Sequence, residues 1–120
     1  MINKTHIRAW VKALRSGKYR RGTSYLAQRE SGRWKYCCLG VACEVARIPA
    51  SQGVDDCSWI KHYGEYPNSR FLPTEAMDFF GLSTGNPARL ADLNDEGWSF
   101  RRIASHIEEV FLKGKKEPTK

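Results

Sequence analysis

The chain has 120 residues, of which 41% are hydrophobic, 28% charged and 12% aromatic. This length predicts one domain, and the near-average composition excludes a collagen-like repeat, a coiled coil and wholesale disorder. No apolar run approaches the roughly 20 residues that a membrane span requires, so we expect no membrane association. The formal net charge of +7 is unevenly spread. Residues 1–36 contain ten Lys or Arg and one acid, whereas residues 37–112 contain six Lys or Arg and eleven acids.

The first predicted element is an amphipathic helix that begins after Thr5, its expected N-cap, and stops at Gly17. A secretory signal would have an apolar core at this place, so we expect no export. The apolar side chains of the helix follow the spacing i, i+3, i+4 and i+7, which predicts that they lie in the core. They are Ile7, Trp10, Val11 and Leu14.

A short basic loop over residues 18–22 precedes two predicted strands, at residues 24–29 and 33–37. The turn-like residues 30–32 between them favour an antiparallel hairpin. Residues 38–47 are apolar nearly all round, with Glu44 as the charged side chain before Arg47, which predicts a buried central helix that ends at Pro49.

The second half begins with an irregular stretch over residues 50–72, where we expect a turn at 51–53 and one or two irregular strands between Trp59 and Tyr66. Three helices follow, at 74–80, from Asn86 onward, and after the capping residue Ser99. The sum is an α+β domain over residues 1–114, with about five helices around a buried central helix and a small antiparallel hairpin or sheet. Residues 115–120 are expected to be a disordered basic tail.

The four cysteines are expected to be structural. Their spacing offers no pair two residues apart of the kind that binds zinc, and adjacent cysteines rarely form a disulfide. We therefore expect no metal and no cofactor, with buried thiols acting as small core side chains. The four are Cys37, Cys38, Cys43 and Cys57.

An enzymatic alternative makes Cys37 or Cys38 a nucleophile of a cysteine-dependent hydrolase. Both lie at a predicted strand-to-helix junction, where the helix N-terminus would lower the pKa of a thiol. His6, His62 or His106 would then act as the base.

The basic front half is the strongest functional signal, because its cations alternate with aromatic residues. Such a surface suits a nucleotide or nucleic acid, with arginines on phosphate and rings on bases. The alternative is a solvated helix face beside a hairpin edge protected by charge. The residues expected to bind phosphate are Arg20, Arg21, Arg33 and Lys35, and those expected to stack are Tyr19, Trp34 and Tyr36.

Further interpretations concern the second half of the chain. Residues 93–104 resemble the opening of a helix-turn-helix, but no recognition helix follows, so we interpret them as two helices packed across a tight turn. Nearby acids, Asp92, Asp95 and Glu96, would suit a metal or a basic partner, although hard cations need more converging oxygens. The stretch 50–72 offers an alternative function as a protein-binding inhibitor of an enzyme. Its expected anchors are Trp59, Tyr63 and Tyr66.

Four segments together resemble a family of small bacteriophage and prophage proteins without an assigned activity. They are residues 10–22 (WVKALRSGKYRRG), 37–43 (CCLGVAC), 71–73 (FLP) and 90–107, which contain LNDEG-x-SF-x-x-IA. The resemblance implies a small accessory protein in the cytoplasm of an infected bacterium. It would act stoichiometrically rather than as an enzyme, countering a host defence by binding a nucleotide signal, a nucleic acid or a host protein. We expect a homodimer, the commonest closed assembly.

Overall fold

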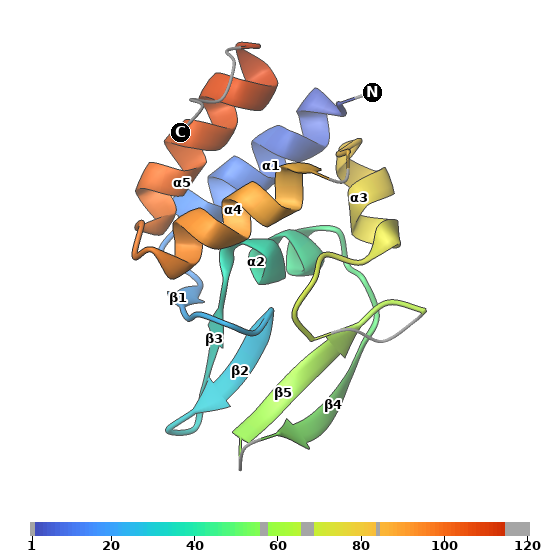
Figure 1. Ribbon diagram of the computed structural model, residues 1–120, viewed down its shortest axis with the longest axis vertical. Coiled ribbons are helices and arrows are strands. Elements are labelled where there is room, and N and C mark those ends of the chain that lie inside the picture. The colour runs from blue at the N-terminus through green and yellow to red at the C-terminus, as the bar shows by residue number, and fades with distance from the viewer. Residues whose placement is uncertain (1, 56–57, 66–68, 84, 115–120) are drawn as a thin grey trace.

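The computed structural model describes residues 2–55, 58–65, 69–83 and 85–114. It is an α+β domain about 41 Å long and 28 by 27 Å across, with a layer of helices above one end of a twisted sheet (Figure 1). The helices are α1 (Lys4–Arg15), α2 (Cys38–Val45), α3 (Thr74–Phe80), α4 (Gly85–Asp95) and α5 (Phe100–Ile107), which continues as a π-helical turn η1 (Glu108–Leu112). The strands are β1 (Arg20–Arg21), β2 (Ala27–Glu30), β3 (Arg33–Tyr36), β4 (Ala50–Asp55) and β5 (Ser58–Tyr63).

The sheet has five strands in the order β1-β3-β2-β5-β4. Two antiparallel hairpins, β2–β3 and β5–β4, are joined through β2 and β5, and β1 pairs in parallel with β3 at the edge. The hairpins extend below the helices in Figure 1, so the far halves of their strands leave the helical layer. Because successive side chains point to opposite faces, this part of the sheet presents two faces.

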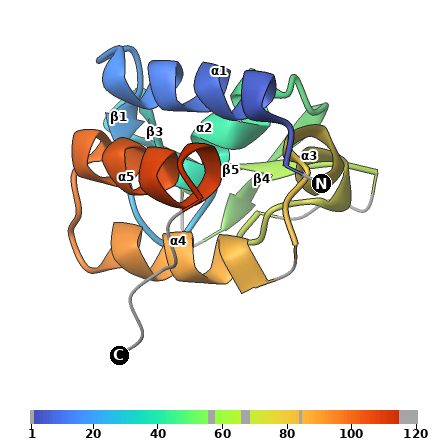
Figure 2. The same cartoon turned by 90° about the horizontal axis from the view of Figure 1, so that it is seen from above.

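The helical layer contains most of the core. α5 packs along α1, and both α5 and α2 lie between α1 and α4, as the view from above shows (Figure 2). All six residues from Cys38 to Cys43 are buried, so the predicted central helix is confirmed. The predicted core face of the first helix is also confirmed, and the Trp10 indole N–H donates to the Cys38 carbonyl at 3.0 Å. That bond removes the cost of burying an unpaired donor.

Gly40 explains how closely α2 approaches the sheet. A Cβ at this position would overlap the carbonyl oxygen of Leu26 and lie 2.6 Å from its carbonyl carbon. The backbone of α2 therefore sits directly on the backbone that leads into β2, and only glycine fits there.

The single domain and the β2–β3 hairpin agree with the sequence prediction, but four details were wrong. The first strand of the hairpin begins at Ala27 and not at residue 24. Asn3, not Thr5, caps α1, because its side chain accepts a hydrogen bond from the His6 N–H at 3.1 Å. The basic loop contains the short strand β1. Residues 51–53 are not a turn but lie in β4, whose pairing with β5 completes a regular hairpin. Cys57, Tyr66 and the expected tail at 115–120 lie outside the described residues.

Candidate anion-binding site

The residues predicted to bind an anion do not share one face of the sheet. Trp34 and Tyr36 point to one side of β3, whereas Arg33 and Lys35 point to the other, because side chains alternate along a strand. Arg20 lies opposite Lys35 in the β1–β3 pairing and joins that second face. The predicted stacking residues are thus separated from three of the four predicted phosphate ligands.

Tyr19 joins the aromatic face. Its ring meets Tyr36 edge-on, with centroids 5.2 Å apart, and Lys61 from β5 lies 4.9 Å above the ring of Trp34 and 5.4 Å from that of Tyr36. Lys61 could not be predicted as part of this site, because nothing local in the sequence links β5 to β3. The three predicted aromatic side chains therefore do form one cluster, around a cation from another hairpin.

Glu44 balances the charge of that cation. It accepts from Lys61 Nζ at 3.5 Å and from the Tyr63 hydroxyl at 2.7 Å, while Tyr63 is fully buried. Burial and the hydrogen bond to Glu44 both raise the pKa of Tyr63. Lys61 is therefore part of a paired network under the aromatic cluster, and its charge is less available to a ligand.

A basic pocket lies next to this cluster, where the loop after α1 meets the N-terminus of α5. Its volume is about 340 Å³, and no carboxylate belongs to its lining. Arg15, Arg21 and Arg101 belong to its lining, together with Tyr19. Tyr19 thus contacts both the basic pocket and the aromatic cluster.

Asn94 positions the loop that carries Arg21. Its buried side chain accepts from the Cys38 N–H at 3.1 Å and donates to the Gly22 carbonyl at 2.9 Å. The backbone carbonyl of Asn94 accepts a hydrogen bond from Arg21 Nη1 at 2.9 Å. One residue at the end of α4 therefore ties the basic loop to the first turn of α2. This is the structural role of the Asn in the LNDEG motif.

The other cations of the pocket are positioned by α1 and α5. Arg15 donates to Glu108 at 2.6 Å and to Ser105 at 3.1 Å, and this ion pair lowers the pKa of the Glu108 carboxyl. Ser99 caps α5 by accepting from the Arg102 N–H at 3.2 Å, as predicted, and Arg101 follows it exposed to solvent. Backbone N–H groups at the start of α5 add positive potential to that of the arginines.

The prediction that a helix N-terminus activates Cys37 or Cys38 is wrong in its direction. Burial raises the pKa of the Cys37 thiol to about 11 and raises the pKa of the Cys38 thiol well above its usual value. Cys37 accepts from the Gly40 N–H at 3.4 Å, and Cys38 donates to the Leu90 carbonyl at 3.5 Å. Both thiols are protonated at neutral pH, because desolvation outweighs the helix terminus. One of the three histidines proposed as a base, His6, stacks on Phe79, with 3.7 Å between the two ring centroids.

The comparisons with known proteins give one match. The family model described as "Domain of unknown function (DUF8296)" matches residues 2–88. No curated protein and no solved structure matches the chain. Within the described residues, no helix combines the length and apolarity needed to cross a membrane, and no group of three or more His, Cys, Asp or Glu is placed to hold a metal ion.

Proposed function

Because the chain belongs to the DUF8296 family, whose description names no activity, we propose from its own geometry that the protein binds a phosphate-bearing ligand. The ligand is a nucleotide or a nucleic-acid strand, and its phosphate occupies the basic pocket. The observation that carries this proposal is that Arg21 and Arg101 line one hollow without a carboxylate in its lining, beside Arg15, whose own charge is paired with Glu108. Guanidinium groups bind phosphate through paired hydrogen bonds as well as through charge.

Tyr19 supports a ligand that has a ring as well as a phosphate. It lines the basic pocket and also contacts Tyr36, beyond which lie Trp34 and Lys61. Aromatic side chains beside a cationic groove stack on bases of any sequence. We expect the base of the ligand to lie toward this aromatic cluster, and we expect modest sequence preference.

The test is a titration of the purified protein with cyclic and linear nucleotides and a fluorescent ten-nucleotide DNA at low salt. Arg101→Glu should weaken binding at least tenfold, because it reverses the charge of a solvent-exposed arginine in the lining of the basic pocket. Arg33→Glu is the matched control. It makes the same change in net charge at an exposed position, on the face of β3 opposite the aromatic cluster. The two variants are compared at physiological salt, where the Debye length is about 8 Å, and there Arg33→Glu should change the affinity less than about threefold.

Equal effects of the two substitutions would show that binding follows net charge and not the basic pocket. Failure of every phosphate ligand to bind more tightly than millimolar at low salt would contradict the proposal altogether. The bacteriophage setting, the role against a host defence and the homodimer belong to the same proposal, supported by the resemblance of the motifs. Sedimentation of the purified chain across a concentration series tests the dimer.

The β4–β5 hairpin supports a second candidate function, binding of a host protein. Of its three expected anchors, Tyr63 is buried, so it cannot act as one. Trp59 is 47% exposed and lies directly opposite Val54, which is 62% exposed. An exposed aromatic and aliphatic pair of this kind is typical of an interface anchor. Trp59→Ala should abolish capture of a host enzyme while leaving nucleotide binding within about twofold, and the reverse result would favour the basic pocket.

A further inference from the structure

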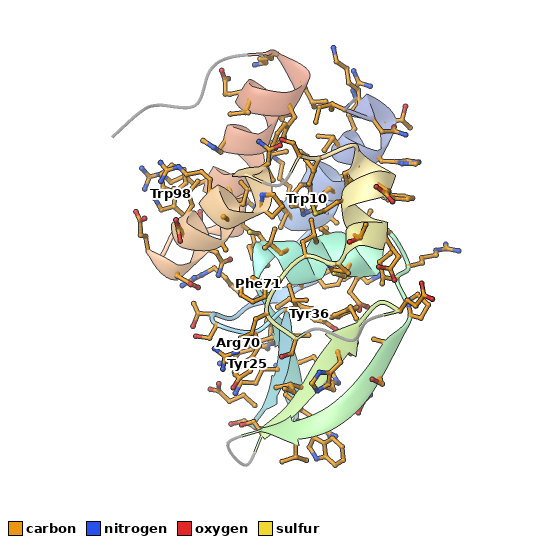
Figure 3. The ribbon with its side chains drawn as sticks, turned by 45° about the vertical axis from the view of Figure 1, so that its right-hand side comes forward. Trp10, Tyr25, Tyr36, Arg70, Phe71 and Trp98 are labelled. Carbon is orange, nitrogen blue, oxygen red and sulfur yellow. The ribbon has the colours of Figure 1, made fainter. Side chains whose placement is uncertain are left out.

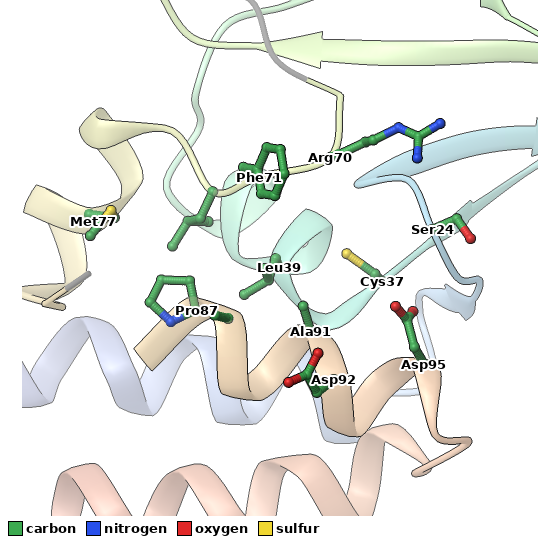
Figure 4. Close-up of a pocket in the computed structure, with 12 residues that line it drawn as sticks. Ser24, Cys37, Leu39, Arg70, Phe71, Met77, Pro87, Ala91, Asp92 and Asp95 are labelled. Carbon is green, nitrogen blue, oxygen red and sulfur yellow. The ribbon is translucent and has the colours of Figure 1, made fainter. Parts of the chain in front are cut away.

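A second pocket lies between α4 and the segment 69–72, and it has a different chemical character (Figure 4). Its volume is about 470 Å³, within the range of about 300 to 1,000 Å³ that is usual for small-molecule sites. Its lining contains none of the three arginines of the basic pocket. We call it the α4 pocket.

One end of the α4 pocket is apolar. Leu39 from α2 and Leu72 form its floor and are almost fully buried, and Met77 and Pro87 close the end between α3 and α4. Phe71 stands at the mouth with 71% of its surface exposed, the highest value among the large exposed hydrophobic residues of the described chain. An apolar or aromatic group that entered this end would cover surface that is now in contact with water.

The other end of the α4 pocket is acidic. Asp92 and Asp95 lie three residues apart on α4, and both line the pocket. Figure 4 shows the Asp95 carboxylate directed toward Cys37. The charge of Asp95 also contributes to the raised pKa of that thiol, although burial is the larger cause.

Arg70 is the cation in the lining of the α4 pocket, and it is held on the opposite wall. Its Nη2 donates to the Tyr25 hydroxyl at 3.2 Å, and its guanidinium lies 4.7 Å from the Tyr25 ring. Figure 3 shows the two side chains beside each other below Phe71. Held by Tyr25, this charge is kept away from α4, so the acidic end keeps its character.

We propose that the α4 pocket binds a small organic amine, with its ammonium group at Asp92 and Asp95 and its apolar or aromatic group among Leu72, Met77 and Pro87. Phe71 covers the ring of the ligand at the mouth. The chain as a whole is basic, with a net charge of +7, so binding of a cation here depends on these local carboxylates. This site is independent of the proposed phosphate site.

The experiment is a titration followed by amide chemical shifts in ¹⁵N–¹H NMR spectra, with 2-phenylethylamine as the probe. Two matched compounds are titrated in parallel: 3-phenylpropionate, which carries the opposite charge, and butylamine, which lacks the ring. We expect saturable shifts at Leu72, Ala88 and Ala91 with a dissociation constant near 1 mM or below, about what a ligand of nine heavy atoms can reach. Each matched compound should bind at least tenfold more weakly.

The variants Asp92→Asn and Asp95→Asn keep the size of the side chains and remove one charge each. Each should weaken binding of the amine at least threefold, and the double variant at least tenfold. Asp78→Asn, at an exposed position on α3, is the control with the same charge change and should alter the affinity less than twofold. Equal binding of amine and carboxylate, or equal effects at Asp78 and Asp95, would overturn the proposal. Arg101→Glu should leave amine binding unchanged, so failure of the phosphate proposal is distinguishable from failure of this one.

Discussion

The helical layer and the far halves of the hairpins differ in how far they bury similar side chains. Trp10 on α1 (Figure 3) is fully buried, and its indole N–H donates to the Cys38 carbonyl, whereas Trp59 on β5 is 47% exposed. Asn94 in the helical layer is completely buried, and its side chain accepts one hydrogen bond and donates another. The difference suggests that stability is concentrated where α1, α2 and α4 meet, while the sheet holds side chains that are available to partners.

The largest effect should come from Gly40→Ala, which tests whether α2 and the sheet are as tightly joined as the packing implies. The new methyl group would overlap the Leu26 carbonyl oxygen, and backbone on both sides prevents a small adjustment. We expect a loss of more than about 3 kcal/mol in the free energy of unfolding, or no soluble protein. Urea unfolding followed by circular dichroism measures it.

Gly32→Ala is the control for this substitution. Gly32 has a φ of +77° in the β2–β3 turn, but a methyl group there would meet no atom within 4 Å. Its cost should be the conformational one alone, about 1 to 2 kcal/mol. A loss at Gly40 no larger than that at Gly32 would show that α2 can move away from the sheet.

The second-largest effect tests whether Asn94, at the end of α4, holds the basic loop to the first turn of α2. Asn94→Ala leaves the Cys38 N–H and the Gly22 carbonyl without their partner, which should cost about 2 to 4 kcal/mol. Asn86→Ala is the matched control, because its side chain accepts from Ser83 near the surface and its loss should cost about 1 kcal/mol. Urea unfolding compares the two. Equal losses would mean that water replaces the buried contacts of Asn94.

The third-largest effect is a pH dependence of the free energy of unfolding, which comes from the buried Cys37 thiol at the N-terminus of α2. Burial holds the pKa of Cys37 at about 11, whereas an unfolded thiol ionises near 8.5. The unfolded chain therefore releases its proton first as the pH rises. The stability that this group contributes is complete below about pH 8.5 and is lost as the pH approaches 11.

Cys37→Ser isolates this contribution, because serine can still cap α2 by accepting from the Gly40 N–H and does not titrate in this range. Between pH 8 and pH 10.5 the wild type should lose up to about 2 kcal/mol more than the variant. Urea unfolding at the two pH values, with reductant present, measures the difference. Parallel losses in the two proteins would mean that Cys37 ionises normally in the folded state.

The helices could be predicted because their signals are local. The spacing of Ile7 and Trp10, the apolar run after Cys38 and the cap at Ser99 each lie within a few residues of the helix that they define. β4 was missed because Ser51, Gln52 and Gly53 are poor strand formers, and only their pairing with β5 keeps them extended.

The candidate site was predicted in part for the same reason. The aromatic cluster of Tyr19, Trp34 and Tyr36 was found, because these residues are close in the sequence. Arg101 was not, since it is 80 residues from Arg21 and only the junction of α4 with α5 brings it to the basic loop. Alternation along β3 separated Arg33 from Trp34, although both were expected at one site.

The smallest effect on stability should come from Trp59→Ala. Trp59 pairs with Val54 on one side and Arg29 on the other, and such cross-strand pairs contribute about 0.2 to 1 kcal/mol. Trp10→Ala, by contrast, should cost at least about 3 kcal/mol, because it leaves a cavity in the helical layer. Urea unfolding of the two variants therefore measures the contrast between the two regions directly. A loss at Trp59 approaching that at Trp10 would show that the hairpin is part of the cooperative core. The presence of an exposed indole would then be explained by its contribution to stability, and no binding partner would be needed to account for it.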